Sequence, residues 1–211
     1  MSSRGLLCVV DKEGEYRVSQ YCRDASPETT GTNALNFLSG EDSEKRKNLL
    51  LSGLKKCRYV SIAERSQMWA DIGVDIFTDN VSDEKHDEFI ANHPYFSKNL
   101  NADILSVIIS DIPSIDLISS LEFVGDCLFC EWVYVIDFCK NTFEVYQGMN
   151  AEPLGEGERF RDFAIFDEYK DAEATSYPPR LLVSYSLDNL PTHEAFMRCI
   201  CLDEHYDEYE I

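Results

Sequence analysis

The sequence lacks any hydrophobic run long enough to cross a membrane, which takes about 20 consecutive apolar residues. The nearest approach, Ile104 to Leu121, is interrupted by Asp111, Pro113 and Asp116. The N-terminal apolar stretch Leu6 to Val10 is too short for the hydrophobic core of a secretory signal. We therefore expect a soluble, cytoplasmic protein with no membrane among its partners.

Basic residues are also scarce. Lysine and arginine number 19 against 39 aspartates and glutamates, so the 211-residue chain carries a formal net charge of −20. Such a charge repels polyanions, and we expect no nucleic acid partner. The simplest interpretation is that the acidic surface keeps the protein in solution. Docking on a basic protein, or mimicry of nucleic acid, is the alternative.

The sequence motifs of several enzyme classes are absent. There is no glycine-rich phosphate loop, no Gly-x-Ser-x-Gly elbow, and no patch of alternating basic and aromatic residues. The four histidines lack the spacing of a metal site such as His-Glu-x-x-His; they are His86, His93, His193 and His205. No complete catalytic set is present, and we expect no cofactor.

Eight cysteines are present, and without an export signal they are expected to be reduced thiols. Two pairs, Cys127-x-x-Cys130 and Cys199-x-Cys201, have enough sulfur between them for a tetrahedral zinc site. However, the first pair has no Gly or Pro turn between its cysteines, and Cys-x-Cys in a helix points its sulfurs apart. We favour buried or surface thiols over a metal site.

Two hairpins carry the strand signal. The first joins Leu6–Val10 to Tyr16–Tyr21 through a turn with Gly14, and the second joins Cys130–Asp137 to Thr142–Tyr146 through Asn141. Apolar residues occupy both faces of the Cys130–Asp137 strand, which predicts that it lies inside the sheet. A further strand is expected at Arg180 to Tyr185.

Helical spacing dominates the middle of the chain. It predicts helices over residues 32–38, 41–54, 63–72, 82–92 and 102–112, and a last helix after Thr192. We therefore predict one α+β domain over residues 1–202, with a mainly antiparallel sheet and helices packed on it. Residues 203–211 are mostly acidic and are expected to be a frayed tail.

Arg4-Gly5-Leu6 with the segment Tyr21 to Gly31, and the later stretch Trp132 to Gly148, resemble a family of uncharacterised proteins found in fungi, bacteria and phages. Arg4-Gly5-Leu6 with the later segment Tyr21 to Gly31 is similar to the family's "YGQWDGYPxGQG" segment. Trp132 to Gly148 resembles its "WxYVIDLDxxTxEVYxG" strand pair, and the stretch from Pro178 to Phe196 looks like the fungal members. The resemblance implies a shared α+β fold but no established activity or cofactor.

The chain departs from the family in the Tyr21 to Gly31 segment. The family's Trp before the Asp has no counterpart, its Gly-Tyr is replaced by Ala25-Ser26, and the Gly after the Pro-x pair is replaced by Thr29. A ligand site that the family builds there can therefore be altered or lost in this chain.

The same segment, Tyr21 to Gly31, is the strongest candidate for a site. It joins a strand to a helix, where backbone N–H groups can meet an anion or polar ligand. Its candidate binding residues are Tyr21, Asp24, Ser26 and Thr30. The alternative is that Asp24 and Thr30 only cap the turn and the following helix.

Two functions stay open at this point. The leading one is an interaction or ligand-binding protein, with a protein or a small molecule as partner. The other is a small hydrolase or transferase that uses Asp24, with Arg23 and Glu28 as helpers. In a variant of the enzyme hypothesis, Ser2 acts as an N-terminal nucleophile once Met1 is removed.

Overall fold

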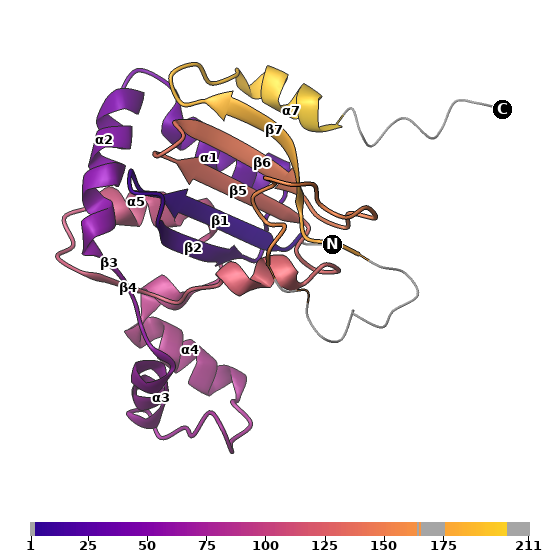
Figure 1. Cartoon of the computed structure of the whole chain (residues 1–211). Helices are drawn as coiled ribbons and strands as arrows, with labels where there is room; N and C mark the ends of the chain where they lie inside the picture. Colours follow the sequence, from indigo (N-terminus) through magenta and orange to yellow (C-terminus); the bar gives the residue numbers. More distant parts are fainter. Residues whose placement is uncertain (1–2, 164, 166–175, 202–211) are drawn as a thin grey trace.

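A five-stranded sheet in the order β2-β1-β5-β6-β7 forms the centre of the molecule (Figure 1). The structure is a computed structural model that describes residues 3–163, 165 and 176–201. All neighbouring strands are antiparallel except β1 and β5, which run parallel. The predicted α+β fold with a mainly antiparallel sheet is confirmed. The strands are β1 (Gly5–Val10), β2 (Tyr16–Cys22), β5 (Trp132–Asp137), β6 (Thr142–Gln147) and β7 (Arg180–Ser186).

The two predicted hairpins lie side by side and supply the central strands. Every residue of β1 and of β5 is buried, because both strands have neighbours on either side and are covered on both faces. The turns are as expected: Gly14 has φ +87° and Asn141 has φ +57°, conformations that glycine and asparagine accept at little cost. Trp132, Tyr134 and Ile136 face one side of the sheet, and Val133 and Val135 the other.

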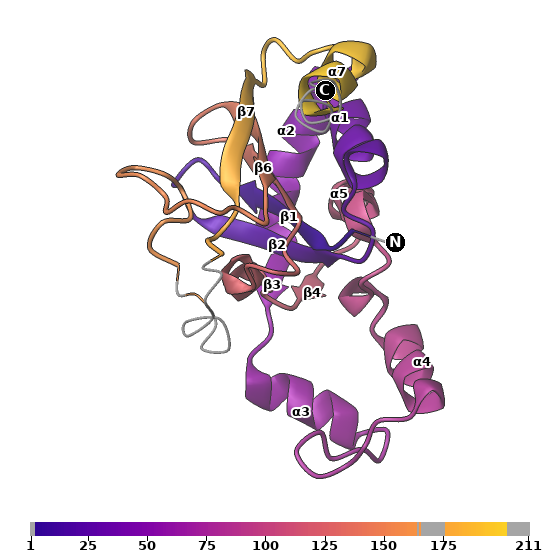
Figure 2. The ribbon, with the colours of Figure 1, turned by 90° about the vertical axis from the view of Figure 1, so that its right-hand side faces the viewer.

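Four helices cover one face of the sheet (Figure 2). Their apolar side chains, such as Leu50, Ile108 and Phe196, are fully or almost fully buried in one cluster with Tyr134 and Phe143 of the sheet. The helices are α1 (Thr32–Leu38), α2 (Ser43–Gly53), α5 (Ile104–Ile109) and α7 (His193–Cys201).

In the part of the chain that the structure describes, shorter segments cover the opposite face. A 3₁₀ helix, η5 (Leu121–Gly125), and the segment 148–163 lie over it and bury Val124 and Phe160 against Leu6 and Val133. The other short helices among the described residues are the π-helix η1 (Pro27–Gly31) and the 3₁₀ helices η2 (Leu54–Lys56), η3 (Pro94–Phe96) and η4 (Asn101–Asp103).

The helices α3 (Ile62–Ala70) and α4 (Asp83–Asn92) project from the edge of the sheet (Figures 1 and 2). We call residues 60–96 the α3–α4 lobe. It is attached through a small parallel sheet of β3 (Cys57–Tyr59) and β4 (Ile115–Leu117). The lobe has an apolar cluster of its own, in which Trp69 stacks on Phe89 at a centroid distance of 3.9 Å.

Some elements differ from the prediction. The helix expected over 102–112 is only α5, because Ser110 is extended and the chain turns toward Pro113 and the strand β4, which was not predicted. The parallel pairing of β1 with β5 was not predicted either. The expected tail, residues 203–211, lies outside the described residues.

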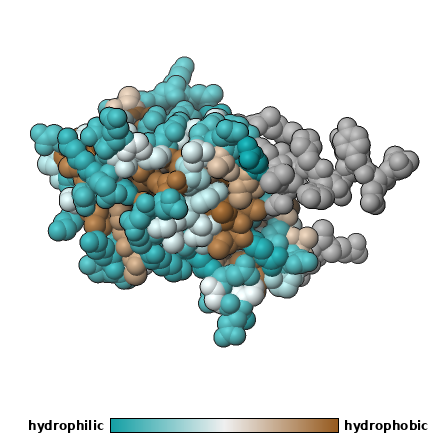
Figure 3. Space-filling view, turned by 90° about the horizontal axis from the view of Figure 1, so that it is seen from above, coloured by the Kyte–Doolittle hydropathy of each residue, from teal (hydrophilic) through white to brown (hydrophobic). Residues whose placement is uncertain are grey.

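No helix in the described part of the chain has the length and apolar character needed to span a membrane. Seen from above, hydrophilic side chains cover most of the molecule and apolar patches lie between them (Figure 3).

Candidate functional site

The predicted site segment, Tyr21 to Gly31, leaves the end of β2 and enters η1. Its central part is tied into the fold: the Tyr134 hydroxyl donates to the Ala25 carbonyl oxygen at 2.9 Å, and the Ala25 N–H donates to the Ser3 carbonyl oxygen at 2.7 Å. Ala25 and Thr30 are completely buried. This part of the segment is therefore a structural junction between the sheet and the helices.

The structure brings Asp24, Ser26 and Thr30 together, but their hydrogen bonds are made within the same segment. The Thr29 hydroxyl donates to the Asp24 carboxylate at 2.9 Å and lies 2.9 Å from the Ser26 hydroxyl. The Thr30 hydroxyl donates to the Asp24 carbonyl oxygen at 2.5 Å. These contacts fit the part of the capping alternative that concerns the turn, whereas neither η1 nor α1 begins with a side-chain cap bond. Glu28 is exposed on the same segment, and Ser2 lies outside the described residues.

The two cysteine pairs do not converge. Cys130 is buried in the cluster on the η5 face of the sheet, whereas α7, which carries Cys199, packs through Phe196 on the opposite face. Within residues 3–163, 165 and 176–201, no group of His, Cys, Asp or Glu side chains is placed to hold a metal ion. The geometry therefore does not support the four-thiolate zinc site considered from the sequence, and the side chain of Cys201 is outside the description.

The buried thiols are also poor nucleophiles. Burial raises the pKa of Cys22 to about 12 and that of Cys127 to about 11. Since the thiolate is the reactive form, neither sulfur is activated for covalent chemistry.

A groove runs between the β2 edge of the sheet and the α3–α4 lobe, and we call it the edge groove. Its first part, the cationic pocket, has a volume of about 510 Å³. Arg4, Tyr21 and Arg23 come from the sheet side, and the rest of the lining comes from α4 and the segment that follows the lobe. The further lining residues are His86, Asp87, Ile90, Ser97, Lys98 and Asn99.

The second part of the edge groove, the aromatic pocket, has a volume of about 480 Å³. It shares Tyr21 and Lys98 with the cationic pocket. The Lys98 ammonium lies 4.8 Å from the centroid of the Tyr21 ring, so the pair forms a common wall held by a cation–π contact. The further lining residues are Gln20, Arg65, Tyr95, Phe96, Ile118, Ser119, Ser120, Glu122 and Phe123.

Hydrogen bonds fix the wall of the groove to the sheet. The Arg23 N–H donates to the Lys98 carbonyl oxygen at 3.1 Å, and the buried Gln20 amide donates to the Ser97 carbonyl oxygen at 2.9 Å. The Asp24 N–H donates to the Asn101 side-chain oxygen at 3.2 Å. The segment 97–101 is thereby held along the edge strand β2, and Lys98 keeps a fixed backbone position beside Arg23.

The residues that line the cationic pocket are mainly basic, whereas the chain as a whole is acidic. Three of its lining residues are basic, Arg4, Arg23 and Lys98, and one, Asp87, is acidic. Burial raises the pKa of the Tyr21 hydroxyl; the charge of Arg4 lowers it, that of Asp126 raises it, and that of Arg23 lowers it to a smaller extent. Both guanidinium groups are therefore close enough to stabilise negative charge beside Tyr21.

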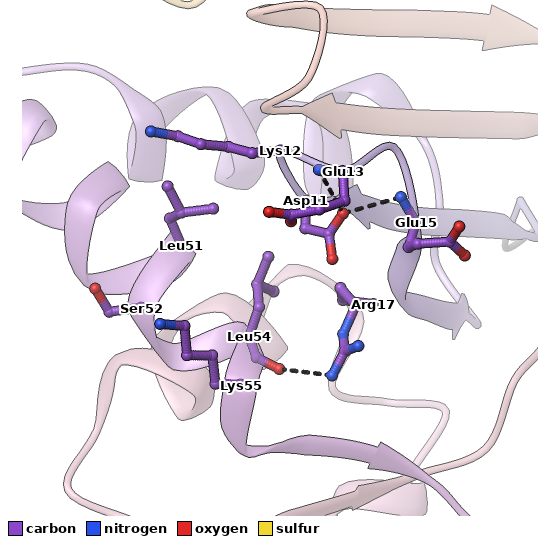
Figure 4. Close-up of a pocket in the computed structure, with 9 residues that line it drawn as sticks. All are labelled: Asp11, Lys12, Glu13, Glu15, Arg17, Leu51, Ser52, Leu54 and Lys55. Carbon is purple, nitrogen blue, oxygen red and sulfur yellow. Dashed lines mark hydrogen bonds between the residues drawn. The ribbon is translucent and has the colours of Figure 1, made fainter.

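A further hollow of about 650 Å³ lies between the β1–β2 turn and the C-terminal end of α2 (Figure 4). Its charges balance, and its central groups are already bonded. The Asp11 carboxylate accepts from the Glu13 and Glu15 N–H groups at 3.0 and 2.9 Å, and Arg17 donates to the Leu54 carbonyl oxygen at 3.5 Å. This hollow has no charge preference comparable to that of the cationic pocket.

A buried ionic cluster fastens the segment 148–163 to the sheet. Arg159 forms ion pairs with Asp137 and with Glu144, the latter at 2.8 Å, and it donates to the Tyr16 hydroxyl at 3.2 Å. Burial lowers the pKa of Arg159, but its bonds to Glu144 and Asp137 outweigh that effect and keep the pKa raised. The Tyr146 hydroxyl donates to Glu144 at 2.5 Å. Because Asp137 and Glu144 already accept bonds from Arg159 and Tyr146, we assign this cluster a role in stability and not in ligand binding.

No protein-family model matches the chain, and no curated protein or solved structure matches it. The family resemblance described for the sequence stays a prediction.

Two residues of the predicted site segment lie in the edge groove. Tyr21 was a predicted binding residue and Arg23 a predicted helper, and both line the cationic pocket. Lys98, His86 and Arg65 were missed, because they are single surface residues far along the chain from Tyr21 and belong to no motif. Only the tertiary fold brings them to the same groove.

Proposed function

We propose that the protein binds a small anionic ligand in the cationic pocket of the edge groove. The observation that supports this most is the local reversal of charge: three basic groups face one acidic group there, while the chain as a whole has 39 acidic and 19 basic residues. Phosphate and carboxylate groups accept charge-assisted hydrogen bonds from arginine and lysine. The chain as a whole is acidic, so this cluster of basic residues is a favourable place for an anion.

Binding is better supported than catalysis. The enzyme hypothesis relied on Asp24, and the Asp24 carboxylate already accepts hydrogen bonds from the Thr29 hydroxyl at 2.9 Å and from the Ser26 N–H at 3.5 Å. A general base needs free access to a substrate proton. We also propose a cytoplasmic location, the kind of compartment in which cysteines such as Cys8 and Cys22 stay reduced.

Calorimetric titration with inorganic pyrophosphate at low ionic strength tests this proposal. We expect Lys98→Gln and Arg23→Gln each to weaken binding about tenfold, as the loss of one charge-assisted hydrogen bond does. Raising the salt concentration should weaken binding further, since the pocket is open to solvent. Lys45→Gln is the matched control. Lys45 is exposed on α2, so this substitution removes the same charge outside the groove.

The proposal is wrong if the wild-type protein does not bind pyrophosphate at millimolar concentration. It is equally wrong if Lys45→Gln weakens binding as much as Lys98→Gln, because the attraction would then be unspecific.

A further inference from the structure

The edge groove contains the aromatic pocket in addition to the cationic pocket, where the anion is proposed to bind. The cationic and aromatic pockets adjoin at the wall formed by Tyr21 and Lys98, so a ligand whose anionic group lies beside Lys98 would extend across this wall into the aromatic pocket. Each pocket falls within the usual range of about 300–1,000 Å³ for small-molecule sites. From this adjacency we propose that the ligand is a nucleoside phosphate, with its phosphate in the cationic pocket and its base in the aromatic pocket. This inference rests on the anion-binding function proposed above.

The aromatic pocket has the chemistry of a base-binding site. Phe96 lines this pocket, but it is buried and stacked on Phe89 of the lobe. The Phe123 and Tyr21 rings pack together with centroids 4.9 Å apart, and Tyr95 lines the same pocket. Bases stack on such rings, and every base has a face that can do so. Arg65 adds a guanidinium group, which can lie over a base plane as well.

Polar groups in the same pocket can read the edge of a base. The Ser120 side chain offers a hydroxyl that both donates and accepts, and Glu122 offers an acceptor, whereas the Ser119 hydroxyl already lies 3.2 Å from that of Ser19. A phosphate or a short carboxylate alone would leave all of these groups unused. The two pockets together therefore suit a ligand with a charged end and a planar, polar-edged end.

A single nucleotide suits the molecule better than a nucleic acid strand. The groove offers one cationic pocket and one aromatic pocket, whereas the chain carries a net charge of −20. A strand that extends past the groove would bring its other phosphates against an acidic surface.

Titration with three kinds of probe tests the inference: inorganic phosphate, ribose 5-phosphate and the four common nucleoside 5′-monophosphates. We expect the preferred nucleoside monophosphate to bind at least about tenfold more tightly than ribose 5-phosphate, as stacking of one base implies. Phe123→Leu should remove most of this gain and leave the affinity for ribose 5-phosphate unchanged. Lys98→Gln should weaken both ligands by a similar factor.

Two further variants show whether the effect of Phe123→Leu is specific to the aromatic pocket. Phe77→Leu makes the same change at an exposed aromatic residue outside the groove, and it should keep the full gain. Tyr95→Leu removes a different ring of the aromatic pocket and should also reduce the gain. Thermal unfolding of Phe123→Leu shows whether the variant remains folded, and if it does not, Tyr95→Leu decides.

The outcomes separate this inference from the function it rests on. If ribose 5-phosphate binds in a Lys98-dependent way and no nucleoside monophosphate binds more tightly, the nucleotide inference is wrong and anion binding stands. If a single-stranded oligonucleotide binds much more tightly than any monophosphate, the ligand is a polymer and the inference is also wrong. If none of the phosphates or pyrophosphate binds, both proposals fail.

Discussion

At the scale of single residues, Arg159 is the centre of the buried ionic cluster. It lies between Asp137 and Glu144, whose side chains are 2% and 6% exposed. Arg159→Met keeps most of the side-chain volume but leaves two buried carboxylates without their cation. We expect the free energy of unfolding to fall by about 3 kcal/mol, the usual result of breaking a buried ion pair on one side. Urea denaturation monitored by tryptophan fluorescence measures it.

Arg161→Met is the matched control, because Arg161 is exposed two residues away and its replacement should change stability by less than about 0.5 kcal/mol. Adding Glu144→Gln to Arg159→Met should restore part of the loss, since one unpaired charge is then removed. Equal stability of the two methionine variants would contradict the role assigned to the ionic cluster.

The residues of the candidate site were only partly predictable from the sequence. Tyr21 and Arg23 belong to a recognisable strand-to-helix junction, and that local pattern drew attention to them. Lys98 carries no such signal, because an exposed lysine is ordinary and its position beside Arg23 depends on hydrogen bonds between distant segments. Asp24 had the strongest local pattern, and the same pattern marks a carboxylate that supports its own turn.

At the scale of elements, prediction succeeded where the signal was local. The hairpins and most helices follow from alternating or helical spacing and from turn residues such as Gly14 and Asn141. The parallel pairing of β1 with β5 could not be read in the same way. Both strands are apolar on both faces, so the pattern shows that each lies inside a sheet but not which strand is its neighbour. That choice depends on the packing of the whole core.

The contact between α2 and α5 offers a test of helix packing. At Gly53 an added Cβ would lie 2.5 Å from the Ile108 carbonyl oxygen and 2.8 Å from its Cγ2 atom. Alanine is favoured over glycine in a helix by about 1 kcal/mol, but overpacking a tight contact costs about 1–3 kcal/mol. We therefore expect Gly53→Ala to lower the free energy of unfolding in a denaturant titration, despite its better helix propensity.

Ser52→Ala tests the same helix without touching α5, because Ser52 is exposed. It should leave stability within about 0.5 kcal/mol of the wild type. If Gly53→Ala proved as stable as the wild type or more so, helix propensity would outweigh the contact, and α2 and α5 would not be in such close contact.

At the scale of the whole molecule, the α3–α4 lobe and the sheet differ in how firmly they are held. The lobe has a small cluster of its own, centred on Trp69 and Phe89, whereas β1 and β5 are buried under the main clusters on both faces. Few buried apolar contacts imply a low free energy of local opening. We expect the amides of α4 to exchange with deuterium at least about tenfold faster than those of β5, measured by mass spectrometry of peptic fragments.

The same exchange experiment connects the lobe to the edge groove. His86, Asp87 and Ile90 of α4 form one wall of the cationic pocket, and Tyr21 and Arg23 of the sheet form the other. A ligand that contacts both walls stabilises, by mass action, the arrangement in which α4 lies against the pocket. Pyrophosphate should therefore slow amide exchange in α4 and leave the exchange rate of β5 unchanged. Equal exchange rates for α4 and β5 in the free protein would mean that the lobe opens only with the whole fold. The groove would then have fixed walls on both sides.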